Sequence, residues 1–97
     1  MAYFLGKLIP PRPTFAHDMS DEEANLMGRH AMYIQGLIDS GTIILAGPVD
    51  DPDGSWGVVV MQAASLEEAT EHLHQDPVIL SNQGFEYKIF PMLGLMR

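Results

Sequence analysis

Apolar and polar positions in this chain follow two periods, which predict two helices and four strands. The first helix lies between Ser20 and Gly41, where apolar residues recur every three or four positions: Ala24, Met27, Ala31, Ile34 and Ile38. Ser20 and Glu23 form a Ser-x-x-Glu capping box at its start, and Gly41 suits the left-handed conformation that ends a helix. The pattern therefore predicts one long helix that buries one face.

The second helix is expected over SLEEATEHLHQ, residues 65–75, and again begins with a Ser-x-x-Glu sequence, at Ser65 and Glu68. Asp76-Pro77 ends it, because the residue before a proline avoids the helical region. Continuing the helical count places Asp76 on the same face as Leu73, so we expect it to point inward, where a carboxylate needs a partner. One more helical turn over residues 78–82 would be capped by Asp76.

Strands are expected where branched and aromatic residues gather between turn residues. The four segments are Ala2–Ile9, Thr42–Ala46, Trp56–Met61 and Phe85–Phe90. Gly47-Pro48 is expected to end the second of them. The order is therefore strand-helix-strand twice, which predicts a ferredoxin-like α+β fold of one four-stranded antiparallel sheet with two helices on one face.

Two of these strands are apolar on both faces, although two helices can cover only one face of a sheet. WGVVVM and TIILA show no alternation between apolar and polar residues. A second copy of the chain, packed sheet to sheet, is the simplest cover for the other face. The 97 residues suit a single domain, residues 1–97, which we expect to form a homodimer.

Composition narrows the classes of partner. The net charge is −8 and only five Lys and Arg residues are present, scattered along the chain, so neither nucleic acid nor an anionic membrane is an expected partner. There is no cysteine, which excludes disulfides, thiol nucleophiles and zinc-thiolate sites. No apolar run approaches a membrane span and the first residues do not read as a signal peptide, so we expect a cytoplasmic protein.

His30 is the first candidate for chemistry. At about 100° per residue it lies roughly 60° from the centre of the apolar stripe, between core and surface. In that position it is either a core-edge histidine bonded to a backbone carbonyl or an acid–base residue that meets a small molecule.

The segment PPRPTFAHDM, residues 10–19, has no helical or strand period and contains three prolines. It is either a rigid connector whose Phe15 fills the edge of the core, or the wall of a pocket in which Arg12 binds an anion.

Several features together resemble the YCII-related family of the dimeric α+β barrel superfamily. They are HAMYIQGLIDSGTIILAGP, the SLEEA helix start, the QDP turn and the strand ending IFP. The resemblance implies a His-Asp pair in a pocket of each protomer, matched here by His30 and Asp76. An aromatic residue often follows the Asp-Pro of the family, whereas Val78 does so here.

The resemblance implies cofactor-free acid–base chemistry, with a relative associated with dehydrohalogenation of a chlorinated aromatic compound. We therefore expect proton abstraction, isomerisation or elimination on a small anionic aromatic or lactone-type compound, a lyase or isomerase type of activity. Arg12 would hold the anion, and Tyr33, one turn after the histidine, would line the pocket or share a proton. Trp56 and Phe15 would provide apolar walls.

Other interpretations remain open at this stage. The chain could be a non-catalytic ligand-binding or regulatory module, or a cofactor-free monooxygenase like some barrel relatives. Asp76 could merely cap the following turn, with His72 as another partner. We expect no metal site, since His72 and His74 face apart on a helix, and no cofactor.

Overall fold

Four strands and four helical segments make up the computed structural model, which describes all residues 1–97. In chain order they are β1 (Ala2–Ile9), α1 (Phe15–Asp18), α2 (Asp21–Asp39), β2 (Ile43–Val49), β3 (Trp56–Ala63), α3 (Leu66–His74), α4 (Pro77–Leu80) and β4 (Glu86–Pro91). The strands form one antiparallel sheet in the order β2-β3-β1-β4. This arrangement confirms the predicted ferredoxin-like fold.

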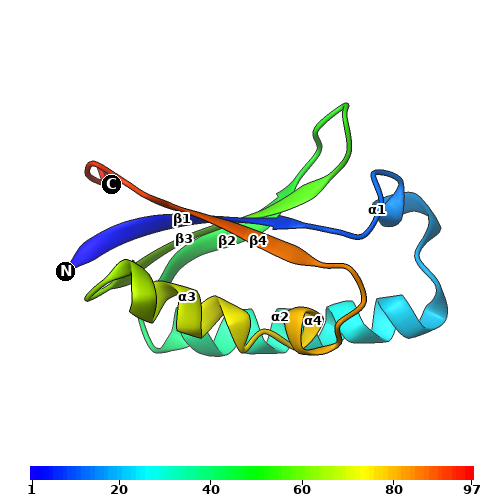
Figure 1. Cartoon of the computed structure of the whole chain (residues 1–97), viewed down its shortest axis with the longest axis horizontal. Helices are drawn as coiled ribbons and strands as arrows, with labels where there is room; N and C mark the ends of the chain where they lie inside the picture. Colours follow the sequence, from blue (N-terminus) through cyan, green and yellow to red (C-terminus); the bar gives the residue numbers. More distant parts are fainter.

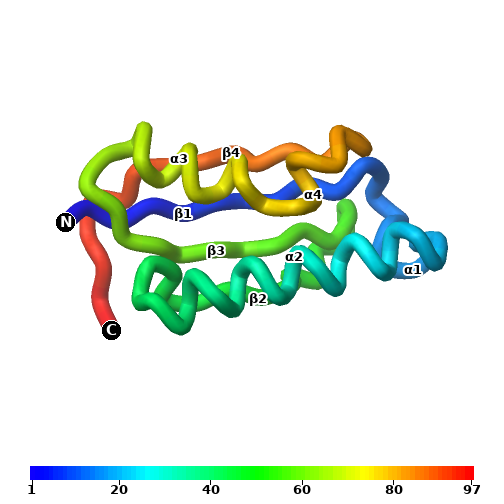
Figure 2. Tube along the Cα trace, turned by 90° about the horizontal axis from the view of Figure 1, so that it is seen from below, coloured from blue at the N-terminus to red at the C-terminus, as the bar shows by residue number.

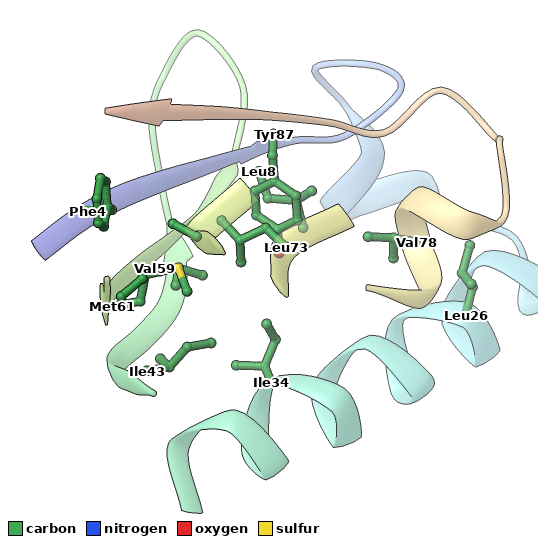
Figure 3. Packing of buried hydrophobic residues seen from close by; sticks show 12 residues of the cluster. Phe4, Leu8, Leu26, Ile34, Ile43, Val59, Met61, Leu73, Val78 and Tyr87 are labelled. Carbon is green, nitrogen blue, oxygen red and sulfur yellow. The ribbon is translucent and has the colours of Figure 1, made fainter. Parts of the chain in front are cut away.

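The helices α2, α3 and α4 lie against one face of the sheet and leave the other face without a helix (Figure 1). Seen from the helix side, α2 runs beside β2 and α3 lies on the side of β1 and β4 (Figure 2). Alternate residues of the two central strands, such as Phe4 and Met61, point into the core between sheet and helices (Figure 3). None of the helices combines the length and apolar character that a membrane crossing requires.

Strand β2 runs further than the sequence predicted. It continues through Gly47 and Pro48 to Val49, so the expectation that Gly47-Pro48 ends this strand was wrong. The reason is the place of β2 at the edge of the sheet, where a proline removes no hydrogen bond of the ladder. Strand β3 likewise extends two residues further, to Ala63.

The proline-rich segment before α2 contains one short helix, α1, which the sequence did not predict. Phe15 in this helix is buried and packs edge-to-face on Phe85, with the ring centroids 5.3 Å apart. Gly84 has a φ of +93°, and a Cβ there would lie 3.1 Å from Pro11. Because only glycine combines that conformation with so close a neighbour, the turn before β4 helps to hold the segment in place.

Candidate functional site

On helix α2, His30 is partly buried and lies in line with Leu26 and Ile34, on one side of the predicted stripe. Leu26 and Ile34, four residues before and after His30, are buried, whereas Ala24 and Ala31 are exposed. The predicted stripe is therefore displaced: α4 packs against α2 and draws the Leu26 side of the helix inward. The helix begins at the predicted capping box, with both Ser20–Glu23 hydrogen bonds formed.

Asp76 lies at the junction of α3 and α4 and is fully buried, as the helical count predicted. It is the N-cap of α4: Val78 donates its backbone N–H to Oδ1 at 3.1 Å, with Pro77 in the first turn. The cap that starts α3 is simpler than predicted, because only the serine half of the Ser65 box is formed. The backbone at this junction therefore fixes the position of the carboxylate.

His30 and Asp76, 46 positions apart in sequence, meet with 2.7 Å between Nδ1 and Oδ2. An ionised carboxylate can only accept hydrogen bonds, so the proton between them belongs to Nδ1 of the imidazole. The second ring nitrogen, Nε2, has no hydrogen-bond partner in the protein, yet no buried side-chain nitrogen or oxygen is left unsatisfied. Nε2 is therefore accessible to solvent, and in a neutral ring its lone pair is free.

Tyr87 on β4 completes this cluster, and it was missed at the sequence level. Its hydroxyl donates to the same Oδ2 of Asp76 at 2.7 Å. Burial raises the pKa of Tyr87, and the neighbouring charge of Asp76 raises it further, so the hydroxyl stays protonated. The available signal was the alternation in FEYKIF: a tyrosine on the dry face of a strand needs a partner for its hydroxyl.

A cavity of about 430 Å³ opens beside His30, between α2, β2 and the segment that contains α1. Four residues of the predicted apolar stripe line it: Met27, Ala31, Ile34 and Ile38. Ala46 and Pro48 from β2 form the opposite wall. Ile34 of this stripe belongs to the core and Met27 and Ile38 pack against it, so the stripe serves both the core and the cavity wall.

The lining of this cavity is mostly apolar and carries no formal charge apart from His30 when it is protonated. Fourteen of its 21 residues are hydrophobic, a number that includes Tyr87 with its hydroxyl, and His30, Gln35 and Ser55 supply the other polar side chains. No Lys, Arg, Asp or Glu belongs to the lining. Such a cavity suits a small, uncharged and largely apolar molecule that meets one basic nitrogen.

Arg12 lies outside this cavity, in contrast to the role of anion clamp that the sequence suggested. Its guanidinium donates to Asp18 at 2.8 Å and to both oxygens of Glu23 at 2.8 and 2.9 Å. The hydrogen bonds from Arg12 lower the pKa of Glu23 to about 2. With these partners, Arg12 fastens the α1 segment to the first turn of α2.

Tyr33 also lies outside the cavity lining. Its hydroxyl donates to the backbone carbonyl of His72 at 2.6 Å and so joins α2 to α3. Burial raises the pKa of Tyr33, with a smaller effect from Asp76. The structure therefore places Tyr33 in the supporting layer behind His30.

Phe15 and Trp56, the two predicted apolar walls, both belong to the lining of the cavity. The Trp56 indole donates to Asp51 at 3.1 Å, and the Lys7 ammonium lies 4.6 Å from its ring centroid. The position of Trp56 at the cavity edge is thus fixed from outside. Nowhere does the chain bring together three His, Cys, Asp or Glu side chains that could bind a metal ion.

The chain is similar to known proteins both in sequence family and in fold. A family model of the YCII-related domain matches residues 4–93. Among solved structures, the fold is similar to that of the 5-chloro-2-hydroxyhydroquinone dehydrochlorinase from Burkholderia phenoliruptrix AC1100, in complex with 2,5-dihydroxybenzoquinone. The TM-score is 0.62 at 19% sequence identity, over 90% of each chain. No curated protein sequence matches this chain.

Proposed function

The chain belongs to the YCII-related domain family, and from this premise we propose that it is a small-molecule enzyme with His30 as general base and Asp76 as its partner. The observation that supports this most is the 2.7 Å contact between a fully buried carboxylate and a histidine that lines an apolar cavity. A buried acid that orients an imidazole, with the other nitrogen free, is the arrangement that proton abstraction requires.

In the proposed reaction, Nε2 of His30 takes a proton from a C–H or O–H group on the substrate. The electron pair of that bond forms a new double bond, and a leaving group departs with its own bonding pair. In an isomerisation the imidazolium returns the proton to another atom instead. Asp76 stabilises the transient imidazolium, since its charge lies 2.7 Å from Nδ1.

The lining of the cavity refines the expected substrate. The anionic compound suggested by the sequence depended on Arg12, which is bound to Asp18 and Glu23 instead. Without a cation in the cavity, a permanent negative charge would lose its water and gain no counter-ion. We therefore propose an uncharged aromatic or lactone-type ring. The solved dehydrochlorinase, whose named substrate is a chlorinated hydroquinone, provides the first compound to try.

The test is a screen of hydroxylated, halogenated and lactone-type rings, beginning with 5-chloro-2-hydroxyhydroquinone. Chloride release and exchange of ring protons with D₂O are measured for the wild type, His30→Gln and His74→Gln. A general base contributes about 100-fold or more to the rate, so His30→Gln is expected to lose at least that factor. His74 is exposed and does not line the cavity, so its variant should keep the activity; full activity in His30→Gln would refute the proposal.

A second function is supported by the apolar lining of the same cavity: the chain could bind a small ring compound without transforming it. The two functions differ in what they require of His30. A binding protein keeps its affinity in His30→Gln, which retains a polar side chain of similar reach, and shows no proton exchange in the bound ligand. Binding measured by calorimetry together with unchanged ligand protons would favour this second function.

We also propose that the chain forms a homodimer through the face of the sheet that carries no helix. One cross-strand row of this face is apolar over all four strands: Leu45, Val60, Leu5 and Phe90. Val60 alternates with the core residues Val59 and Met61, so this row faces away from the helices. Leu45 and Phe90 are each 50% exposed in the single chain. A second sheet packed on this face would bury both side chains.

The dimer is tested by sedimentation equilibrium of Phe90→Glu and a matched control, Leu80→Glu. Both residues are exposed apolar side chains, but Leu80 belongs to α4 on the helix side. We expect Phe90→Glu to sediment as a monomer and Leu80→Glu as a dimer. A monomeric wild type, or a dimer that survives Phe90→Glu and fails in Leu80→Glu, would contradict this interface.

A further inference from the structure

The side chains of His30 and Tyr87 are both hydrogen-bonded to Oδ2 of the buried Asp76. We infer that Tyr87 is a positioning residue that sets how readily His30 holds a proton, by donating to the same Asp76 oxygen. The inference rests on the proposed function only for its effect on the reaction rate. The effect on His30 itself follows from the geometry of the cluster.

The geometry leaves little freedom in this cluster. Oδ2 of Asp76 lies 2.7 Å from Nδ1 of His30 and 2.7 Å from the hydroxyl of Tyr87, while Oδ1 accepts from the backbone of Val78. Tyr87 is 8% exposed, and its ring packs among core residues beside Leu8 and Leu73 (Figure 3). The hydroxyl is thus held against the carboxylate by the packing of the ring.

Two donors on one oxygen compete for its negative charge. A hydrogen bond from a buried neutral hydroxyl stabilises the carboxylate and weakens the field that it exerts on its other partner. Tyr87 therefore reduces the stabilisation that Asp76 gives to the protonated imidazole. A weaker hold on that proton favours the form of His30 that can accept a proton from a substrate.

The other titratable groups near His30 do not compete with this effect. Asp76 comes from the α3–α4 junction, Tyr87 from β4 and Tyr33 from α2 itself, one turn along. Both tyrosines have raised pKa values and stay neutral. No cationic side chain lines the cavity in front of the imidazole. Asp76 is thus the charged group that is hydrogen-bonded to His30, and Tyr87 acts directly on that charge.

The experiment is an NMR titration of the His30 ring in the full chain, followed through its ¹³C and ¹H resonances, with no substrate present. In Tyr87→Phe the ring remains and only the hydroxyl is lost. We expect the His30 titration midpoint to move to higher pH by about half a unit or more. The matched control is Tyr33→Phe, which loses a hydroxyl bonded to a carbonyl and not to Asp76; its midpoint should move by less than half as much.

A second variant tests the same inference in case Tyr87→Phe does not fold. Fluorotyrosine incorporated at position 87 keeps the hydroxyl and makes it a stronger donor, so the midpoint should move to lower pH. An unchanged midpoint in both variants, or a shift of the same sign in both, would overturn the inference.

If the proposed function holds, the acid limb of the pH–rate profile of each Tyr87 variant moves in the same direction as its His30 titration midpoint. The plateau rate at high pH is retained. A purely structural role for Tyr87 would instead lower the plateau and leave the limb in place. Because the titration needs no substrate, opposite shifts in the two variants would support the role of Tyr87 even if His30→Gln proved fully active.

Discussion

The chain contains two clusters in which a nitrogen donor meets a carboxylate at almost the same distance. In one, Arg12 contacts Asp18 and Glu23 at 2.8 Å; in the other, His30 contacts Asp76 at 2.7 Å. The side chains of Arg12, Asp18 and Glu23 are 36%, 50% and 16% exposed, whereas His30 is 17% exposed and Asp76 is fully buried. Distance therefore does not distinguish the two clusters, but their surroundings do.

The difference in burial changes what each cluster can do. Solvent screens the charges of the Arg12 cluster, so this cluster can hold the α1 segment against α2 while contributing little to the stability of the fold. The charge of Asp76 has no water and is satisfied by three donors: His30, Tyr87 and the backbone of Val78. A charge held in this way acts strongly on its neighbours, which is what a catalytic base needs from its partner.

The largest expected effect is on stability. Asp76→Ala removes the acceptor for the buried Tyr87 hydroxyl and the partly buried His30, and it removes the cap of α4, so we expect a loss of about 3 kcal/mol or more in the free energy of unfolding. The matched change in the exposed cluster, Asp18→Ala, is expected to cost much less. Urea denaturation of both variants measures this difference. Similar losses for the two would show that the buried and the exposed carboxylate contribute equally to stability, contrary to this prediction.

The second effect is the coupling between the two partners of the buried pair. In a double-mutant cycle of His30→Ala and Asp76→Asn, we expect an interaction energy of about 1 to 3 kcal/mol, the range for a hydrogen bond to a charged group. The corresponding cycle of Arg12→Ala and Asp18→Asn should give a smaller energy that falls as salt is added. A larger interaction energy for Arg12 and Asp18 than for His30 and Asp76 would contradict this expectation.

The smallest expected effect is the loss, at low pH, of the stabilisation that Arg12 gives through Glu23. The pKa of Glu23 is lowered from an ordinary 4.5 to about 2, so the stabilisation from Arg12 is complete above about pH 4.5 and is lost as the pH falls toward 2. Arg12→Met should therefore lower the midpoint of thermal unfolding at about pH 6 but have little effect at about pH 2.5. Arg29, exposed on α2 and in no ion pair, provides the control: Arg29→Met should show no such dependence.

The sequence predicted the fold and the pairing of His30 with Asp76 for different reasons. The fold followed from local signals, the capping serines and the two apolar periods, which the tertiary structure keeps. Asp76 was expected to point inward because its position continues the buried face of α3, and burial forces a carboxylate to find partners. The specific pairing with His30 came from the family resemblance, since spacing along the chain carries no such information.

What the sequence could not provide was the arrangement of side chains between elements. Arg12 and Asp18 are six residues apart, yet nothing in the PPRPTFAHDM pattern shows that α1 brings them together. Tyr87 joins the cluster only because β4 is the neighbour of β1, which sets its hydroxyl over the α3–α4 junction. The displacement of the α2 stripe likewise depends on its contact with α4, a tertiary effect that periodicity alone does not reveal.

The central claim is that Asp76 holds His30 with a free nitrogen turned to the cavity. The most direct measurement is the ¹⁵N spectrum of the His30 ring in uniformly labelled wild-type protein, at a pH above its titration. We predict that Nδ1 carries the proton and that Nε2 shows the shift of an unprotonated nitrogen, which moves when a ring compound enters the cavity. A ring protonated at Nε2, with Nδ1 bare, would contradict the account, because Asp76 would then not be orienting a base.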